Sequence, residues 1–228
     1  MSTNRRNTVQ DASTETVTLL KADELGRIER VERGGVLLIR RDIGSARWWA
    51  RGFARRAAAR EARALGKLDG IDGVPRLLAW DGRVLERSYM AGLPMQQGQP
   101  RDAAYYRRAL RLLAVLHRRG IVHNDLAKEP NWLVREDGTP GLVDFQIAWT
   151  RGKRGALFRL LAREDLRHLL KHKRTYVADA LSARQRAILA QPAPHSRLWR
   201  ATGKRLYKLI ARKVFGYWDN EGQGRVRR

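Results

Sequence analysis

Two polar motifs in the middle of the chain carry side chains that suit phosphoryl transfer. The first, HNDLAKEPN, contains Asp125 and Asn131, and the second, DFQ, begins with Asp144. Phosphoryl transfer needs a carboxylate near the acceptor hydroxyl, oxygen ligands for Mg²⁺ and cations on the phosphates. Asp125 offers the carboxylate, and Asn131 and Asp144 offer a neutral and an anionic oxygen. The alternative is turn chemistry, because Asp and Asn commonly cap turns.

The elements around these motifs must place them at a common edge. RDAAYYRRALRLLAVLHRRG predicts a helix that Gly120 ends, and its expected apolar face carries Leu110, Leu113, Ala114 and Leu116. Strands are expected at 132–134 and 141–143, on either side of an EDGT turn. Ligands beside neighbouring strands can share one hard cation, and Mg²⁺ accepts few protein ligands besides water and phosphate oxygens.

The first part of the chain predicts strands and one long helix. Residues 25–31 and 36–41 read as strands joined by a reversal at 32–35, where paired glycines supply positive φ. SARWWARGFARRAAAREARALGKL predicts a helix of about 20 residues. Its expected inward stripe is Trp49, Phe53, Ala57, Ala58, Glu61, Ala62 and Leu65. Glu61 is unusual there, since an inward carboxylate normally needs a cationic partner.

The order of elements predicts an α+β chain in two parts. Residues 1–20 are expected to be a disordered lead-in, and 21–91 a small lobe of antiparallel strands with the long helix. A linker near 92–100 then leads into a mostly helical lobe over 92–228, with helices broken near Gly155 and at residues 192–194.

Composition limits the class of protein. The chain has 228 residues, 43% hydrophobic and 31% charged, which is typical of a globular protein able to bury a core. The absence of cysteine excludes disulfides and thiolate metal sites. No apolar run approaches the roughly 20 residues that span a bilayer, and the N-terminus lacks an apolar signal core, so the expected location is the cytoplasm.

The net charge of +24 is concentrated toward the C-terminus. Residues 151–228 hold 21 Lys and Arg against 5 Asp and Glu. Such a field attracts polyanions such as nucleic acid or anionic lipid, although solvated helix faces give the same composition. No nucleic-acid-binding motif is present, so specific binding to nucleic acid is not expected.

Aromatic residues beside arginines allow two readings. Trp48, Trp49 and Phe53 lie among arginines and could form an interfacial helix, but core packing is the favoured prediction. In the tail, RLWRATGKRLYKLIARKVFGYW, the apolar residues fall near helical spacing. That stripe is expected to pack on the helical lobe, with docking to an acidic acceptor or anionic membrane as the alternative.

HNDLAKEPN followed by DFQ resembles the catalytic loop and metal-binding motif of the protein-kinase-like superfamily. The order of the other segments is similar over residues 25–150. GVPRLLAWDG, VLERSYMAG and EDLRHLLKHK most resemble small bacterial kinases grouped with lipopolysaccharide-core (Kdo/heptose) kinases and RIO-type serine/threonine kinases. The resemblance implies a two-lobed protein-kinase-like fold, with an antiparallel-sheet N-lobe and a mostly helical C-lobe.

The resemblance also implies site roles. Asp125 orients or deprotonates the acceptor hydroxyl, Asn131 and Asp144 hold Mg²⁺, and His123 is a scaffold residue. The residues expected to contact or position ATP are Gly34 and Gly35 in the phosphate-covering hairpin, Arg41 in the phosphate-contacting strand, Glu61 in the helix, and Glu86 and Tyr89 in the strand that leads to the adenine-binding hinge.

Four departures from the superfamily pattern bear on these roles. Five residues separate Asp125 from Asn131 where the usual pattern has four, so the loop must bulge or Asn131 must shift. Arg41, or its neighbour Arg40, stands where a lysine is usual, and strand alternation sends the two to opposite faces. The glycine loop is reduced to two glycines. DFQ replaces DFG, which removes backbone freedom. Lys128 is a further candidate phosphate contact.

These features predict an ATP- and Mg²⁺-dependent kinase. The favoured acceptor is a sugar hydroxyl of an anionic glycolipid such as lipopolysaccharide core, reached by peripheral contact with the cytoplasmic face of the inner membrane. A protein acceptor, as in serine/threonine kinases, is the same chemistry. The loss of the strand lysine and the lengthened loop raise the alternative of a pseudokinase or scaffold.

Overall fold

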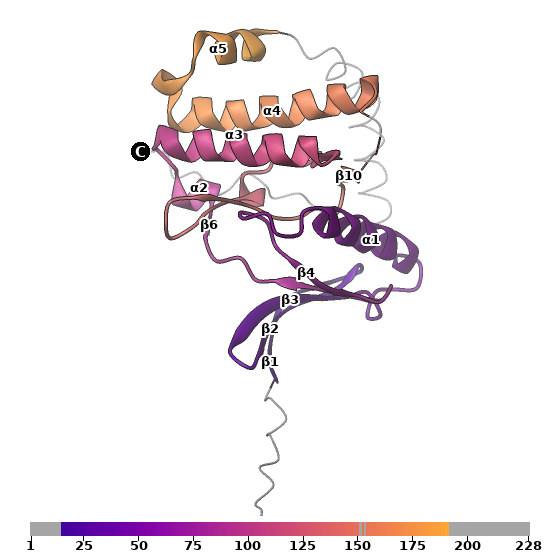
Figure 1. Ribbon diagram of the computed structural model, residues 1–228. Helices are drawn as coiled ribbons and strands as arrows, with labels where there is room; N and C mark the ends of the chain where they lie inside the picture. The colour runs from indigo at the N-terminus through magenta and orange to yellow at the C-terminus, as the bar shows by residue number, and fades with distance from the viewer. Residues whose placement is uncertain (1–14, 151, 153, 192–228) are drawn as a thin grey trace, which may run out of the picture. The chain divides into compact units, whose positions relative to one another are not determined.

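The computed structural model describes residues 15–150, 152 and 154–191, which form two compact units (Figure 1). The sheet unit comprises the described residues up to Arg55 together with Leu77–Tyr89. The helical unit comprises Arg56–Arg76 and the described residues from Met90 onward. The predicted α+β class, with an N-terminal antiparallel sheet followed by helices, is confirmed.

Five antiparallel strands form the sheet, in the order β1-β2-β3-β5-β4. The strands are β1 (Glu15–Asp23), β2 (Gly26–Arg33), β3 (Val36–Asp42), β4 (Leu77–Trp80) and β5 (Val84–Ser88). Buried apolar side chains of β2, β3 and β5, among them Val31, Leu38, Ile39 and Leu85, anchor the sheet. The β-branched and apolar residues of these segments favour this half-buried pleated surface.

The hairpin between β2 and β3 follows the prediction. Arg33 pairs with Val36, so Gly34 and Gly35 form a two-residue turn with φ of 55° and 77°. Positive φ at both positions matches the twist of the flanking strands, and glycine adopts it without a Cβ clash. A Cβ at either glycine would meet no heavy atom within 4 Å, so backbone conformation rather than crowding favours glycine here.

Strand β1 corrects the prediction of a disordered lead-in over residues 1–20. Residues 15–20 belong to β1 and pair with β2, while residues 1–14 lie outside the described residues. The side chains of this segment are exposed, Val17, Leu19 and Leu20 among them, so the strand buries no apolar face. Thr16, Val17 and Thr18 are β-branched and favour extended backbone, and the ladder with β2 then supplies hydrogen bonds to that backbone.

Helix α1 (Arg51–Lys67) is shorter than predicted, because Trp48, Trp49 and Ala50 form a turn before it. Its buried face consists mainly of small side chains: Ala54, Ala57, Ala58, Glu61, Ala62, Ala64 and Leu65. The predicted inward stripe is correct from Ala57 to Leu65 but wrong for Trp49, which is 38% exposed, and for Phe53, which is 53% exposed. The prediction of core packing is also wrong for Trp48, which is 84% exposed.

Two long helices, α3 (Ala103–Arg118) and α4 (Ala156–Tyr176), pack against each other in the helical unit, and α5 (Ala183–Ala190) contacts α4 (Figure 1). Asp102 caps α3 by accepting the Ala104 N–H at 2.7 Å, and Gly120 with φ of 74° follows its end as predicted. Helix α4 begins after Gly155, where a break is predicted. The core contains Tyr105, Tyr106, Leu113, Leu116, Trp132, Phe145, Leu169 and Leu170.

Five short strands pair within the described part of the helical unit, four of them between α3 and α4 and one, β6, before α3. Strand β7 (Ile121–Val122) pairs with β10 (Trp149–Thr150), and β8 (Trp132–Val134) lies between β6 (Leu93–Pro94) and β9 (Pro140–Leu142). The two strands predicted on either side of the EDGT turn are therefore confirmed, the second displaced by one residue. The remaining elements of the unit are the short helix α2 (Met95–Gly98) and the 3₁₀ turns η1 (Glu129–Asn131) and η2 (Ala178–Ala180).

Two features concern the ends of the predicted lobes. The helical unit includes residues 56–76, which precede the linker near 92–100 where the sequence places the boundary. Residues 192–228, with the predicted basic helical tail, lie outside the described residues. Within the described part of the chain, no helix has the length and apolarity needed to cross a membrane.

Candidate active site

The loop after β7 holds Asp125 in a partly buried position, with its side chain 17% exposed. Asn124 turns the chain with a left-handed φ of 66°. The Nδ2 of Asn131 donates to the backbone carbonyl of Asp125 at 2.9 Å and to its Oδ2 at 3.0 Å. The Nζ of Lys128 lies 3.4 Å from the same Oδ2. Three of the predicted site residues are thus in direct contact.

The pKa of the Asp125 carboxyl is raised, and burial is the largest cause. Burial raises the pKa of its carboxyl above the ordinary value, because the carboxylate loses hydration. The charge of Lys128 and the hydrogen bond from Asn131 act to lower the pKa, while the charge of Asp144 acts to raise it. The net effect is a raised pKa, which suits a carboxylate that accepts a proton from a substrate.

The extra residue between Asp125 and Asn131 is accommodated by consecutive turns. The Lys128 N–H donates to the Asp125 carbonyl at 3.4 Å, and the Asn131 N–H donates to the Lys128 carbonyl at 3.2 Å. Pro130 lies in the first turn of η1, where its missing N–H is not needed. The expected bulge is therefore a 3₁₀ turn, and it brings the Asn131 amide back to Asp125.

His123 is a fully buried link between the two motifs. Its Nδ1 accepts the Asp125 N–H at 3.3 Å, so its Nε2 carries the hydrogen and donates to the Val143 carbonyl at 3.0 Å. Its ring centroid lies 4.7 Å from that of Phe145. Because both ring nitrogens are engaged by the protein, His123 has the geometry of the expected scaffold residue.

Asp144 follows β9 in a left-handed conformation with φ of 66°, which non-glycine residues adopt only at some cost. Its Oδ1 is buried and has no hydrogen-bond partner among the described residues. The preceding residue, Val143, donates its N–H to the Asn131 carbonyl at 3.0 Å and so joins the two motifs. A buried carboxylate oxygen without a donor is the atom type that a hard cation binds.

Asn131 and Asp144 each carry an oxygen of the type that magnesium binds. The amide nitrogen of Asn131 is engaged by Asp125, which leaves the amide oxygen as the atom able to coordinate a cation, and Asp144 offers its buried Oδ1. Over the described ranges, no group of three or more His, Cys, Asp or Glu side chains is placed to hold a metal. Magnesium does not require such a group, because it commonly takes one or two protein oxygens together with substrate phosphates and water.

Asp165 of α4 holds the loop that carries His123 and Asp125, and the sequence prediction missed it. Its side chain is 1% exposed, and it accepts the His123 N–H at 2.8 Å and the Asn124 N–H at 3.0 Å. The Nε2 of His117 lies 3.3 Å from its Oδ2. The available signal was a carboxylate one helical turn before Leu169, on the buried face of an apolar helix.

Arg40 and Arg41 lie on opposite faces of β3, as strand alternation predicts. Arg40 is the ladder partner of Glu86, and Arg41 is the ladder partner of Leu85. The Arg40 guanidinium forms ion pairs with Glu86 at 2.9 Å and with Glu15 at 2.6 Å. Arg41 is half-buried and forms no ion pair with another described residue.

Arg33 joins this ion-pair cluster, contacting Glu86 at 3.1 Å and Glu15 at 3.0 Å. Hydrogen bonds from Arg40 and Arg33 lower the pKa of Glu15. Burial acts to raise the pKa of Glu86, but hydrogen bonds from the same two arginines outweigh it and lower that pKa. The carboxylate of Glu86, a predicted cofactor contact, is therefore engaged within the sheet.

The remaining predicted residues lie in different settings. Gly34 and Gly35 occupy the exposed hairpin tip. Tyr89, 38% exposed, follows β5 and donates its N–H to the Leu37 carbonyl at 3.1 Å. Glu61 is 2% exposed on the buried face of α1, within the helical unit.

The described contacts group the predicted site residues into two sets. Asp125, Lys128 and Asn131, together with Asp144, belong to the helical unit, and the cluster around Glu86 belongs to the sheet unit.

Neither a protein-family model nor a curated protein matches this chain.

Proposed function

We propose that the protein is an ATP-dependent phosphotransferase that moves the γ-phosphoryl group to a hydroxyl acceptor. The observation that carries the proposal is the contact between Asn131 and Asp125, in a loop that the Val143 N–H joins to the Asp144 motif through the Asn131 carbonyl. A carboxyl suited to taking a proton therefore adjoins an amide oxygen and a carboxylate suited to a cation. These are the protein groups that phosphoryl transfer requires.

In this reaction the oxygen of the acceptor hydroxyl bonds to the γ-phosphorus. The bond between that phosphorus and its bridging oxygen breaks, and ADP leaves with the electron pair. Asp125 orients the hydroxyl and takes its proton. Lys128 balances charge at Asp125 and contacts the transferred phosphate. Asn131 and Asp144 hold Mg²⁺, which when bound supplies charge neutralisation on the phosphate oxygens.

The proposed architecture is the two-lobed protein-kinase-like fold. It is supported by the antiparallel sheet, by the buried Glu61 on α1 and by a helical unit that carries both motifs. Gly34, Gly35 and Tyr89 are then the proposed ATP contacts of the sheet unit, whereas the Glu86 carboxylate is engaged by Arg33 and Arg40. Arg41 is the better phosphate contact of the arginine pair, because Arg40 is engaged by two carboxylates.

The proposed acceptor is a sugar hydroxyl of an anionic glycolipid. The support is the net charge of +24, which attracts a polyanionic acceptor and favours its encounter with the protein. A protein hydroxyl is the alternative acceptor for the same chemistry. A transfer screen with labelled ATP against lipopolysaccharide fragments, generic protein substrates and the protein itself separates these acceptors.

The experiment that tests the activity compares the wild-type protein with Asp125→Ala and Asp144→Asn. Thermal stabilisation by ATP should require Mg²⁺ in the wild type and should be weakened in Asp144→Asn. ATP turnover should be lost in both variants. Asp137→Asn, in the exposed turn after β8, is the matched control and should retain both properties.

Two results would contradict the proposal in different ways. Mg²⁺-dependent ATP binding without turnover that depends on Asp125 would make the protein a pseudokinase. If ATP does not stabilise the protein at all, HNDLAKEPN and DFQ do not form a phosphotransfer site. The two motifs would then be turns between strands.

A further inference from the structure

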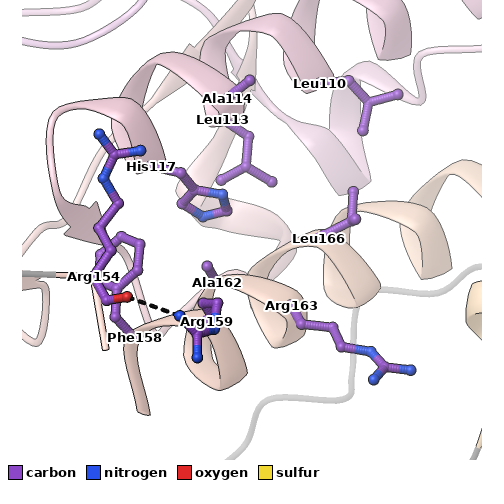
Figure 2. Close-up of a pocket in the computed structure, with 10 residues that line it drawn as sticks. All are labelled: Leu110, Leu113, Ala114, His117, Arg154, Phe158, Arg159, Ala162, Arg163 and Leu166. Carbon is purple, nitrogen blue, oxygen red and sulfur yellow. Dashed lines mark hydrogen bonds between the residues drawn. The ribbon is translucent and has the colours of Figure 1, made fainter. Parts of the chain in front are cut away.

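A groove of about 570 Å³ lies between α3 and the beginning of α4, away from the residues assigned above to phosphoryl transfer. Figure 2 shows side chains of the two helices facing each other across it. The lining residues are Leu110, Leu113, Ala114 and His117 from α3, Phe158, Arg159, Ala162, Arg163 and Leu166 from α4, and Arg154 just before α4.

The floor of the groove is apolar and only partly covered. Leu110, Ala114, Ala162 and Leu166 are half-buried, although Leu110 and Ala114 belong to the face of α3 that was predicted to be inside. Phe158 closes the floor at one end, with its ring centroid 6.3 Å from that of His117. Half-exposed apolar residues gathered in one groove favour an apolar occupant.

Three arginines accompany this floor, and their contacts are to neutral oxygens. Arg154 donates to the Arg118 carbonyl at 3.3 Å, Arg159 donates to the Arg154 carbonyl at 3.3 Å, and Arg163 donates to the side chain of Gln191 (Figure 2 shows the second). None of the three forms an ion pair with a carboxylate of the described residues. Their charge is therefore uncompensated locally and suits an anion.

Apolar floor and cationic rim together define the occupant. A free phosphate would leave the apolar residues exposed, and an uncharged chain would leave the guanidinium groups without an anion. A lipid with an anionic headgroup satisfies both parts, because its acyl chain covers the floor while arginines contact its phosphate.

We propose that this groove binds an acyl chain of an anionic membrane lipid, with Arg154, Arg159 and Arg163 on the headgroup. Binding at this place would bring the helical unit to an anionic bilayer surface. It needs no nucleotide and does not depend on the proposed phosphotransfer.

The groove also adjoins the support of the catalytic loop. His117 lines the groove, and its Nε2 lies 3.3 Å from Asp165, the carboxylate that accepts the N–H groups of His123 and Asn124. An occupant that packs on His117 restrains this carboxylate. We therefore expect lipid binding to slow hydrogen exchange of the His123 and Asn124 amides. Any effect of this restraint on activity rests on the proposed function.

The test is co-sedimentation of the full-length protein with vesicles of phosphatidylglycerol and of phosphatidylcholine, without nucleotide. Arg159→Ala should weaken binding to phosphatidylglycerol vesicles by about fivefold. Ala162→Gln leaves the charge unchanged but makes the floor polar, and it should weaken binding by about tenfold. Arg184→Ala removes an exposed arginine of α5 that does not line the groove, and it is the matched control.

Three results would overturn the proposal. Equal losses in Arg159→Ala and Arg184→Ala would mean that net charge alone attracts the vesicles. Unchanged vesicle binding by the Ala162→Gln variant would show that no acyl chain occupies the groove. Variant-sensitive binding of monomeric dodecyl phosphate without vesicle binding would make the ligand a soluble amphiphile. Amide exchange at His123 that lipid does not alter would refute the coupling alone.

Discussion

The side-chain amide of Asn131 donates two hydrogen bonds to Asp125, one to its backbone carbonyl and one to its carboxylate. This pair fixes the orientation of the carboxylate that is proposed to take a proton. It also leaves the amide oxygen of Asn131 for a cation beside Asp144. The two proposed functions of the site, proton transfer and metal binding, would therefore both depend on the Asn131 side chain.

Replacement of Asp125 by Asn should separate catalysis from stability. We expect turnover to fall by about 10²- to 10⁴-fold, because the amide cannot take the proton of the acceptor hydroxyl. The melting temperature should not fall at neutral pH, because the change removes a carboxylate that burial makes costly to ionise. Initial rates and thermal melts measure the two effects. A melting temperature that collapses together with the rate would show a structural role for Asp125 instead.

The raised pKa of Asp125 predicts a specific pH dependence of stability. A carboxyl whose pKa is higher in the folded state stabilises the fold fully below its unfolded pKa, and that contribution is lost as pH rises through the folded pKa. Asp125→Asn cannot ionise at this position. Its free energy of unfolding should therefore increase relative to wild type as pH rises from below the ordinary value of 3.8 toward neutrality. Urea unfolding of both proteins over this pH range measures the difference. A constant difference would refute the raised pKa.

Loss of Asp165 should destabilise the protein and loosen the loop that carries His123 and Asp125. Asp165→Asn places an amide nitrogen against one of the two N–H donors of His123 and Asn124, so one buried donor loses its acceptor. We expect the free energy of unfolding to fall by about 1–3 kcal/mol. Urea unfolding measures this loss, and hydrogen exchange at the two amides should accelerate. Asp179→Asn, at an exposed position in η2, is the control and should show neither effect.

Neighbouring arginines on β3 should respond differently to truncation. Arg40→Ala leaves Glu15 and Glu86 with Arg33 as their remaining ion-pair partner in the cluster, and it should lower the free energy of unfolding by about 1–2 kcal/mol. Arg41→Ala breaks no ion pair with a described residue and should cost less than about 0.5 kcal/mol. Urea unfolding at low and high salt measures the free energy of unfolding of both variants. Added salt should reduce the difference between them, because it screens the ion pairs that Arg40→Ala removes.

The same pair of variants addresses the nucleotide. If Arg41 contacts phosphate, Arg41→Ala should weaken Mg²⁺–ATP binding while leaving the fold intact. If only Arg40→Ala loses ATP binding, under conditions where that variant is folded, Arg40 rather than Arg41 contacts the phosphate.

The local chemistry of the site could be predicted from sequence because its residues are close in the chain. Asp125, Lys128 and Asn131 span a single loop, and their contacts depend on one 3₁₀ turn. The hairpin tip at Gly34 and Gly35 is similarly local, since the positive φ values belong to two adjacent residues. Short-range patterns of this kind are dictated by backbone sterics and side-chain reach.

Pairings across long separations could not be predicted in the same way. Asp165 follows His123 by 42 positions, and its role appears only when α4 packs beside the loop. Strand β1 leaves its apolar residues Val17, Leu19 and Leu20 exposed, and it is held as a strand by its ladder with β2. The exposure of Trp48, Trp49 and Phe53 around the start of α1 is likewise decided by the packed chain, so helical periodicity alone did not predict it.

The sequence by itself determined the α+β class, the hairpin, the helix that Gly120 ends, the break before α4 and the residues of the two motifs, because each depends on periodicity or on adjacent side chains. Tertiary structure decided which carboxylates are buried, which arginine of β3 is paired and where the half-covered groove between α3 and α4 lies. Burial and long-range pairing are properties of the packed chain, because the free energy of a charge or an apolar group depends on what surrounds it.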